Sequence, residues 1–151
     1  MLAWLKRRSK QLVDGLTPER RSWLMSQVRG KNTTPEMRVR RTAHALGLRF
    51  RLHRGDLPGT PDLVFPKHRT ALFVHGCFWH RHQNCPKSSL PKSRVEYWEC
   101  KFQRNVLRDS EVEEALRKDG WRVALVWECE TKNAAQLREA LFNMFCIAPG
   151  S

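Results

Sequence analysis

The chain has 151 residues, 40% of them hydrophobic, which suffices for a buried core and excludes a globally disordered protein. No apolar run nears the ~18 residues of a membrane span, and the apolar start MLAWL precedes its charges, unlike a secretory signal, so we expect a cytoplasmic protein with no membrane partner. Lysine and arginine number 28 against 15 acidic residues, a net charge of +13 that favours a polyanionic partner, nucleic acid ahead of a membrane surface.

In chain order, residues 1–16 are expected to be a poorly ordered basic extension, and residues 17–148 to form one domain. The first predicted helix follows Thr17-Pro18 and closes at Gly30, and the second begins at Thr34-Pro35 and stops at Gly47. Each has a capping threonine, a proline in its first turn and a closing glycine, the usual signals of a helix start and end.

The rest of the chain is predicted to alternate short strands with helices. Apolar alternation and short apolar runs predict strands at 48–52, 62–65, 71–74 and 121–127. Two further helices are predicted over 94–118 and 134–145. Because the predicted helices are longer than the predicted strands, we expect a mixed α/β domain in which helices flank a small central sheet.

Cysteine and histidine gather in one segment, His75 to Cys85. The chain has five cysteines, an odd number that favours metal binding or buried thiols over a disulfide framework. Four residues have the ligand types of a closed tetrahedral zinc site: Cys77, His82, Cys85 and Cys129. His80 could replace His82, and composition alone does not separate them. The alternative is that the cysteines are small buried hydrophobic residues, which suits Cys100 and Cys146.

Asp62 is a candidate ligand for a hard cation, because it follows Pro61 at the start of an apolar strand that a second strand would pair with. Magnesium-dependent nucleases often place an aspartate and a backbone carbonyl at such a paired edge, where the ion neutralises phosphate charge. A simple turn aspartate is the alternative.

Aromatic residues separate into two groups. Trp121 and Trp127 lie in a predicted strand and are expected in the core. Phe78 and Trp79 instead lie in a polar, ligand-rich segment, and Trp98 starts a predicted helix. Aromatic side chains in such exposed settings can insert between base pairs and stack there.

These residues, in this order, resemble the very short patch repair endonucleases, the bacterial DNA mismatch endonucleases called Vsr. The resemblance covers about residues 17 to 130 and is carried by separate motifs: MSQVRGKNTTPE at 25–36, LPGTPDLVF at 57–65, HGCFWHRH at 75–82, EYW at 96–98, NVLRD at 105–109 and GWRVALVWEC at 120–129.

The resemblance implies a fold like that of type II restriction endonucleases, with a central mixed sheet and flanking helices. It implies a monomer that nicks the T-containing strand of a T:G mismatch, 5′ to the T. Such mismatches arise when 5-methylcytosine deaminates, so a cytosine-5 methyltransferase and a repair polymerase would be functional partners on double-stranded DNA.

The resemblance also implies roles for the polar residues. Asp62 and the Val74 backbone carbonyl would hold catalytic Mg²⁺, and His80 would be the general base. Asp109 would orient His80, while His75 and Glu36 would hold water. The structural zinc set would be Cys77, His82, Cys85 and Cys129, although Gln83-Asn84 makes the spacing to Cys85 one residue longer than in some relatives.

For the aromatic residues, the resemblance implies a wedge in the DNA. Phe78, Trp79 and Trp98 would enter beside the mismatch from the major groove, and Met25 and Val28 would approach from the minor groove.

Two rival functions remain at this stage. One is a zinc-stabilised DNA-binding protein that senses lesions without cutting, which would have no use for both Asp62 and His80. The other is a nuclease of the same fold that cuts undamaged duplex, for which an aromatic wedge at Phe78 and Trp79 is unexpected.

Overall fold

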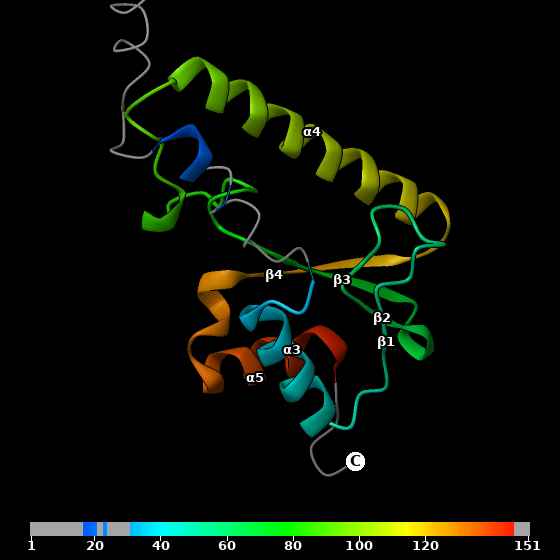
Figure 1. Cartoon of the computed structure of the whole chain (residues 1–151). Helices are drawn as coiled ribbons and strands as arrows, with labels where there is room; N and C mark the ends of the chain where they lie inside the picture. The colour runs from blue at the N-terminus through cyan, green and yellow to red at the C-terminus, as the bar shows by residue number, and fades with distance from the viewer. Residues whose placement is uncertain (1–16, 21–22, 24–30, 147–151) are drawn as a thin grey trace, which may run out of the picture.

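The computed structural model describes residues 17–20, 23 and 31–146 (Figure 1). Residues 18–20 and 23 are helical, and Thr17 Oγ1 accepts a hydrogen bond from the Arg20 N–H, which is the cap that the sequence predicts. The remainder of that predicted helix, including Met25 and Val28, lies outside the described residues, as does the predicted extension over 1–16.

A four-stranded mixed sheet forms the centre of the fold, in the order β1-β2-β3-β4 (Figure 1). The strands are β1 (Arg51–Leu52), β2 (Leu63–Phe65), β3 (Thr70–His75) and β4 (Arg122–Trp127). β1 and β2, and β2 and β3, pair antiparallel, whereas β3 and β4 pair parallel from Thr70↔Arg122 to His75↔Trp127. The prediction of a mixed α/β fold with a small central sheet is therefore confirmed.

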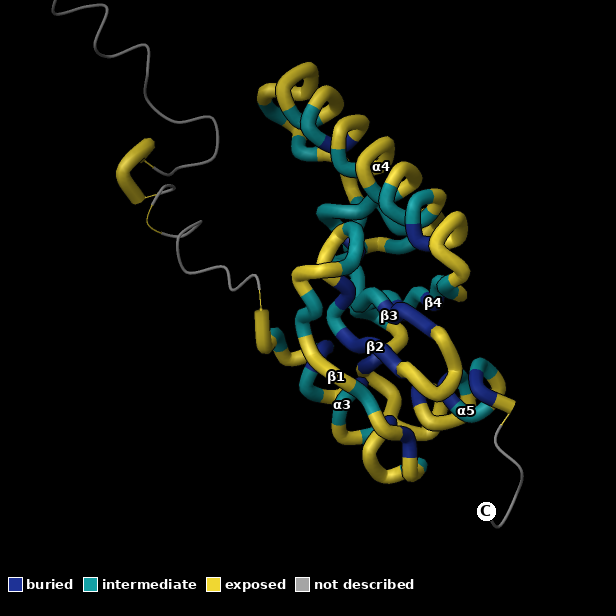
Figure 2. The backbone as a smooth tube through the Cα atoms, turned by 90° about the vertical axis from the view of Figure 1, so that its right-hand side faces the viewer, coloured by how far each residue is buried: buried dark blue, intermediate teal, exposed yellow. Residues whose placement is uncertain are grey.

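Three helices pack on this sheet, two on one face and one on the other (Figures 1 and 2). α3 (Thr34–Ala45) and α5 (Ala134–Phe145) lie side by side on one face, and α4 (Val95–Lys118) crosses the opposite face. Side chains cap two of these helices: Thr33 accepts a hydrogen bond from the Glu36 N–H, and Asn133 accepts one from the Gln136 N–H. These bounds match the predicted helices closely.

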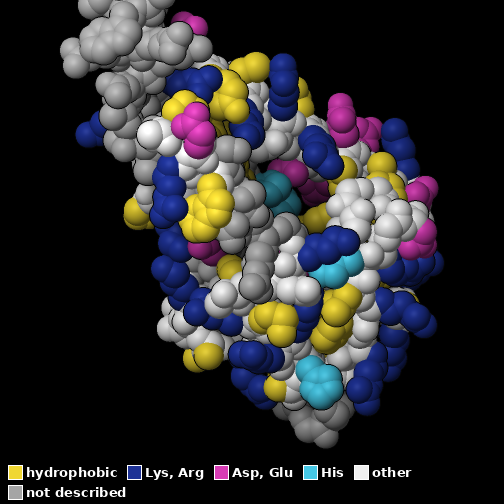
Figure 3. All heavy atoms as spheres, viewed as in Figure 1, with side chains coloured by type: hydrophobic (Ala, Val, Ile, Leu, Met, Phe, Trp, Pro, Cys, Tyr) yellow, Lys and Arg dark blue, Asp and Glu magenta, His cyan; other side chains and the backbone are white. Residues whose placement is uncertain are grey.

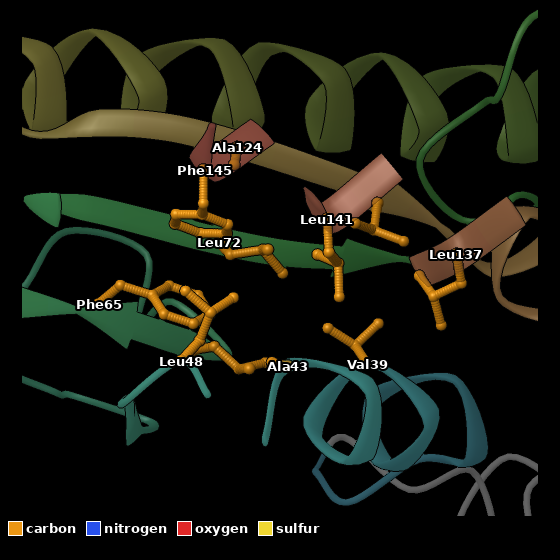
Figure 4. Close-up of a cluster of buried hydrophobic side chains, with 11 residues drawn as sticks. Val39, Ala43, Leu48, Phe65, Leu72, Ala124, Leu137, Leu141 and Phe145 are labelled. Carbon is orange, nitrogen blue, oxygen red and sulfur yellow. The ribbon is translucent and has the colours of Figure 1, made fainter. Parts of the chain in front are cut away.

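The main hydrophobic core lies between the sheet and the α3–α5 pair (Figure 4). Val39 of α3, Leu72 of β3 and Leu141 of α5 are fully buried in it. The ring of Phe65 in β2 packs on that of Phe145, with centroids 4.5 Å apart. This tightly packed half is the rigid support for the residues described below.

The opposite face of the sheet is packed more loosely. α4 has 24 residues, but it buries just Phe102 and Leu116. Between α4 and the outward side chains of β3 and β4 lies a cavity of about 300 Å³. The middle of α4 is therefore not packed tightly on the sheet, and the cleft described below is lined by the same part of this helix.

Two short 3-10 turns, Pro86–Ser88 and Glu128–Thr131, were not predicted, because each is shorter than the periods on which sequence patterns depend. The strand predicted at 48–52 is regular only at Arg51–Leu52. No helix within the described residues has both the length and the apolar character that a membrane crossing requires.

A glycine controls how closely the loop before β2 approaches α4. Gly59 has φ of +70°, and a Cβ there would collide with Cγ1 of Val112. We predict that Gly59→Ala lowers the free energy of unfolding by about 1–3 kcal/mol, through overpacking and left-handed backbone strain. Urea unfolding measures this, with Gly55→Ala as the control, because a Cβ at Gly55 meets nothing within 4 Å. Equal effects of the two substitutions would contradict the close approach.

Candidate active site and metal centre

A cleft of about 840 Å³ opens beside the end of β3, between the start of α3 and the middle of α4. Three histidines and four acidic side chains line it, together with Lys31 and Arg108: His53, His75, His80, Glu36, Asp62, Asp109 and Glu128. Figure 3 shows histidine and acidic side chains recessed in a hollow on this face, with lysine and arginine around it. The sequence predicted five of the seven, and the exceptions are His53 and Glu128.

Asp62 lies just before β2, at the paired edge that the sequence predicts. Its Oδ2 accepts a hydrogen bond from the Val74 N–H at 2.7 Å, so the carboxylate and the Val74 backbone lie together. The pKa of Asp62 is raised to about 6, mainly because burial disfavours the charged carboxylate. The hydrogen bond from the Val74 N–H lowers this pKa by less than burial raises it. The negative charge of Glu36 also raises the pKa, and Arg40 lowers it. Asp62 is thus a carboxylate whose charge would be stabilised by a cation in the cleft.

His80 and Asp109 form a hydrogen-bonded pair across the cleft. Nδ1 of His80 lies 2.6 Å from Oδ2 of Asp109, which α4 presents toward the sheet. If Nδ1–H donates to the carboxylate, Nε2 carries the lone pair and can accept a proton. The structure thus brings together the pair that the sequence predicted, in the arrangement that suits a general base.

His75 stacks on His80, with ring centroids 3.8 Å apart and planes 9° from parallel. Burial lowers the pKa of His75 to about 4; the charge of His80 lowers it too, and Asp109 opposes both. His75 is therefore neutral near pH 7 and can hydrogen-bond to water without adding positive charge to the cleft.

Glu36, in the first turn of α3, is 2% exposed. Its Oε2 accepts hydrogen bonds from the Asn32 N–H and from Arg40 Nη2, each at 3.1 Å, and His53 Nε2 lies 3.6 Å away. Sequence reasoning missed Arg40 and His53. The spacing of Glu36 and Arg40, one helical turn apart, is a signal that could have found Arg40.

The Cys/His group lies next to the cleft. Each of Cys77, His82, Cys85 and Cys129 offers one ligand atom, and these atoms all lie within 4.8 Å of one another, so the group can hold a metal ion. Cys85 belongs to the group although Gln83-Asn84 separates it from His82, and Asn84, just before it, has a left-handed conformation with φ of 56°. His80 is turned away to Asp109, and this resolves which histidine joins the cysteines.

Thiol ionisation in this group depends on a cation. The pKa of Cys129 is raised to about 12, mainly by burial and also by hydrogen bonding and charge from Cys77 and Cys85. Hydrogen bonding to the backbone at Lys87 instead lowers the pKa of Cys85. Three thiols this close cannot all ionise without a positive partner, which a metal ion supplies.

The expectation that Cys100 and Cys146 are buried is wrong, since both are exposed. Cys100 lies on the outward side of α4, and Cys146 is the residue that ends α5. Neither belongs to a group of possible metal ligands among the described residues.

The aromatic cluster consists of five rings contributed by the 76–80 loop and the start of α4: Phe78, Trp79, Tyr97, Trp98 and Phe102. Ring centroids of Phe78 and Trp79 are 5.0 Å apart, and those of Phe78 and Trp98 are 5.8 Å apart. Phe102 is buried beneath them, whereas Tyr97 is 48% exposed. Phe78, Trp79 and Trp98, which the sequence grouped by function, are thus brought together.

Asn105 and Lys101 were also missed. Asn105 Nδ2 donates to the Trp79 carbonyl at 3.1 Å, one helical turn before Asp109, and Lys101 Nζ lies 5.2 Å from the Trp79 ring centre. Side chains on one face of α4 therefore hold the loop that carries both Trp79 and His80.

Neither Trp121 nor Trp127 belongs to the core, contrary to expectation, since each is half-buried. Trp127 faces the α4 side of the sheet, where its ring stacks on His82 at 4.2 Å and meets His75 edge-on at 5.5 Å. Trp121 packs against the guanidinium of Arg69, 4.8 Å from the ring centre.

The fold and the site together define a class: a mixed α/β protein with an acid–histidine cleft beside a Cys3His group able to hold a metal ion. Residues 13–87 match the family described as DNA mismatch endonuclease Vsr. The chain is 56% identical over 133 residues to the Type II nicking enzyme V.XorIIP of Xanthomonas oryzae pv. oryzae, covering 88% of this chain and 97% of that relative.

Two other relatives agree. Identity is 41% over 130 residues to the Type II nicking enzyme V.NmeAIP of Neisseria meningitidis serogroup A, covering 86% of this chain and 92% of the relative. It is 38% over 119 residues to the DNA mismatch endonuclease Vsr of Escherichia coli K12, covering 79% and 76%. The chain belongs to the Vsr family of DNA mismatch endonucleases, which confirms the resemblance seen in the sequence.

The raised pKa of Asp62 predicts a pH-dependent effect of its removal. The folded protein disfavours the ionised form of Asp62. Burial of this charge therefore lowers the free energy of unfolding by its full amount above about pH 6, and has no effect below the ordinary pKa of 3.8, where the carboxyl is protonated in both states. Without added divalent cation, we expect Asp62→Asn to raise the free energy of unfolding by up to about 3 kcal/mol at pH 8, and by little near pH 4. Urea unfolding at both pH values measures this.

The matched control is Asp56→Asn, since Asp56 is exposed and is paired with Arg54. We expect it to change stability by less than about 0.5 kcal/mol at either pH. An Asp62→Asn protein that is less stable than the unchanged protein at pH 8 would contradict the effect of burial.

Proposed function

We propose that this protein nicks the T-containing strand of a T:G mismatch, 5′ to the T, and so starts repair of deaminated 5-methylcytosine. Membership of the mismatch endonuclease family supplies the reaction class. One observation carries the proposal: Asp62 and the hydrogen-bonded His80–Asp109 pair line the same cleft, next to the aromatic cluster.

In the proposed reaction, His80 accepts a proton at Nε2 from the attacking water. Asp109 holds Nδ1, fixes the tautomer and stabilises the imidazolium that forms. His75 is neutral and stacked on His80, so it supports the ring and can hydrogen-bond to water without repelling the imidazolium. Glu36 is proposed to hold a further water through Oε1, because its Oε2 is occupied by donors.

Mg²⁺ is the proposed catalytic cofactor, held by Asp62 and the Val74 backbone carbonyl. When bound, it would supply positive charge to neutralise the scissile phosphate. The residues fit such an ion, because burial leaves the Asp62 carboxylate without full compensation, as its raised pKa of about 6 shows. The hydrogen bond from the Val74 N–H keeps the carboxylate at the strand edge.

Zn²⁺ is the proposed occupant of the Cys3His group. Cys129 Sγ lies 3.4 Å from His82 Nδ1, and a tetrahedron with ordinary Zn–S and Zn–N bonds has an edge of about 3.5 Å between such ligands. The ion would join the 77–85 segment to Cys129, two residues beyond the end of β4. It would thereby fix the directions of Phe78, Trp79 and His80, which lie between the ligands in sequence.

The aromatic cluster is the proposed wedge into DNA. A T:G wobble pair stacks less well than a Watson–Crick pair, so opening the stack beside it costs less. Phe78, Trp79 and Trp98 supply stacking surfaces, with Lys101 above the Trp79 and Trp98 rings as a cation for nearby phosphate. Met25 and Val28, outside the described residues, are proposed to approach from the minor groove.

The proposed biological setting follows from the substrate. A 5-methylcytosine must be made before it can deaminate, so a cytosine-5 DNA methyltransferase acts earlier and a repair polymerase acts after the nick. We propose that the protein acts as a monomer on double-stranded DNA, with its net charge of +13 supplying salt-sensitive affinity.

Nick mapping tests the proposal. We expect the protein with Mg²⁺ to cut a duplex with a single T:G pair once, 5′ to the T, and to leave the matched T:A duplex intact. We expect His80→Ala to slow nicking by about 10²–10⁴-fold, as for loss of a general base. The control is His44→Ala, an exposed histidine outside the cleft.

Other outcomes identify the rival functions. Equal cutting of both duplexes would indicate a nuclease of undamaged DNA. Tight mismatch binding without a nick at any Mg²⁺ concentration would indicate a lesion-binding protein.

The Cys3His assignment predicts metal content. We expect purified protein to carry one zinc per chain. We expect Cys129→Ala to lose zinc and to unfold at a lower temperature, because the free energy of metal binding then no longer stabilises the folded state. Inductively coupled plasma analysis and thermal melting measure the two effects. Cys100→Ala is the control, since this exposed cysteine lies outside the group. Zinc-free wild-type protein would overturn the assignment.

A further inference from the structure

One side of the cleft is formed by Glu36, His53 and Asp62, and we call it the acidic wall. Arg40 lies behind this wall, where its side chain is 11% exposed. One nitrogen, Nη2, lies 3.1 Å from Glu36 Oε2 and 2.9 Å from His53 Nε2. Nη1 donates to the Met37 sulfur, and Nε is buried without a hydrogen-bond partner among the residues that the structure describes. The contacts with Glu36 and His53 therefore fix the position of this guanidinium.

Without Arg40, the same wall would be a set of metal ligands. One donor atom from each of Glu36, His53 and Asp62 lies within 4.8 Å of the others. Two carboxylates and an imidazole suit Mn²⁺ and related divalent ions. Two-metal phosphodiester sites place their ions roughly 3.5–4 Å apart. Asp62 is a member both of this group and of the Mg²⁺ site proposed above, so two ions bound here would share it.

Arg40 occupies the donor atoms that a second ion would need. A guanidinium only donates hydrogen bonds, so the close Nη2 contact must use the lone pair on His53 Nε2. Glu36 Oε2 already accepts from both Arg40 and the Asn32 N–H. Arginine keeps its charge at all ordinary pH values and would repel a divalent ion at this position.

The positive charge of the guanidinium also offsets the negative charges of Glu36 and Asp62, as a divalent ion would. Glu36 raises the pKa of Asp62 through charge repulsion, and Arg40 opposes that repulsion. Glu36 is nearly inaccessible to solvent, so water cannot provide this screening.

We propose that Arg40 is a resident cation that takes the place of a second divalent ion, so that Asp62 binds a single catalytic ion. Arg40 is a positioning residue here, because it acts through Glu36 and His53 and does not reach the reacting atoms. The inference rests on the proposed metal-dependent nicking function.

Counting bound Mn²⁺ by electron paramagnetic resonance tests the inference. Full-length, zinc-loaded protein in a His80→Ala background, which prevents cutting, is mixed with the T:G duplex and titrated with Mn²⁺, and binding to the duplex alone is subtracted. We expect one Mn²⁺ with the spectrum of an isolated ion. We expect Arg40→Ala to bind two Mn²⁺ with a spin-coupled spectrum, since two ions sharing Asp62 would be roughly 4 Å apart.

The matched control is Arg41→Ala, the next residue of α3, which is exposed and should leave the number at one. Arg40→Met keeps much of the side-chain volume without the charge, and should also bind two ions if the alanine protein does not fold. Two Mn²⁺ bound to protein that retains Arg40, or one Mn²⁺ bound to folded Arg40→Ala or Arg40→Met protein, would overturn the inference.

Failure of the underlying function gives a different result. If Asp62→Asn, in the same background, binds as many Mn²⁺ ions as the protein with Asp62, the metal site proposed for nicking is absent. In that case the ion count says nothing in favour of Arg40, and both proposals fall together.

Discussion

The parallel pairing of β3 and β4 is the contact on which the site depends. It runs in register from Thr70↔Arg122 to His75↔Trp127, so the two strands end side by side. The chain leaving β3 carries Cys77 to Cys85, and the chain leaving β4 carries Cys129, which is how ligands far apart in sequence form one group. A shift of this register by one residue would turn Ala124 and Val126 out of the core and would separate the ligands.

The long helix α4 provides the second constraint, because this one rigid element contributes rings to the aromatic cluster and holds the loop that carries Trp79 and His80. Trp98 near its start joins the aromatic cluster, Asn105 holds the Trp79 carbonyl and Asp109 holds His80. Loose packing of α4 on the sheet leaves the cleft open at the same place. The aromatic cluster and the His80–Asp109 pair are therefore both positioned by one helix.

Charge in the cleft is balanced within a small volume. Asp62 is a half-buried acid and Glu36 a buried one, and Arg40 opposes the repulsion between them. His75 stays neutral beside His80 because burial disfavours its charged form. Each of these states follows from low solvent access, which strengthens every charge interaction in the cleft. The protein thus prepares a position for positive charge at Asp62 while filling the neighbouring position at Glu36 with its own guanidinium.

Local signals in the sequence determined the helices, the strands and the residues of the site, because caps, turn residues and apolar periodicity act over a few neighbours. They located α3, α4 and α5 closely and marked Asp62, His80 and Cys129 as candidates. The tertiary structure placed His82 beside the cysteines, and it alone decided that Cys100 is exposed, that Trp127 leaves the core, and that His53 approaches Glu36 and Arg40. These depend on strand register and on how α3 and α4 face the sheet, which are contacts between distant segments that no local pattern encodes.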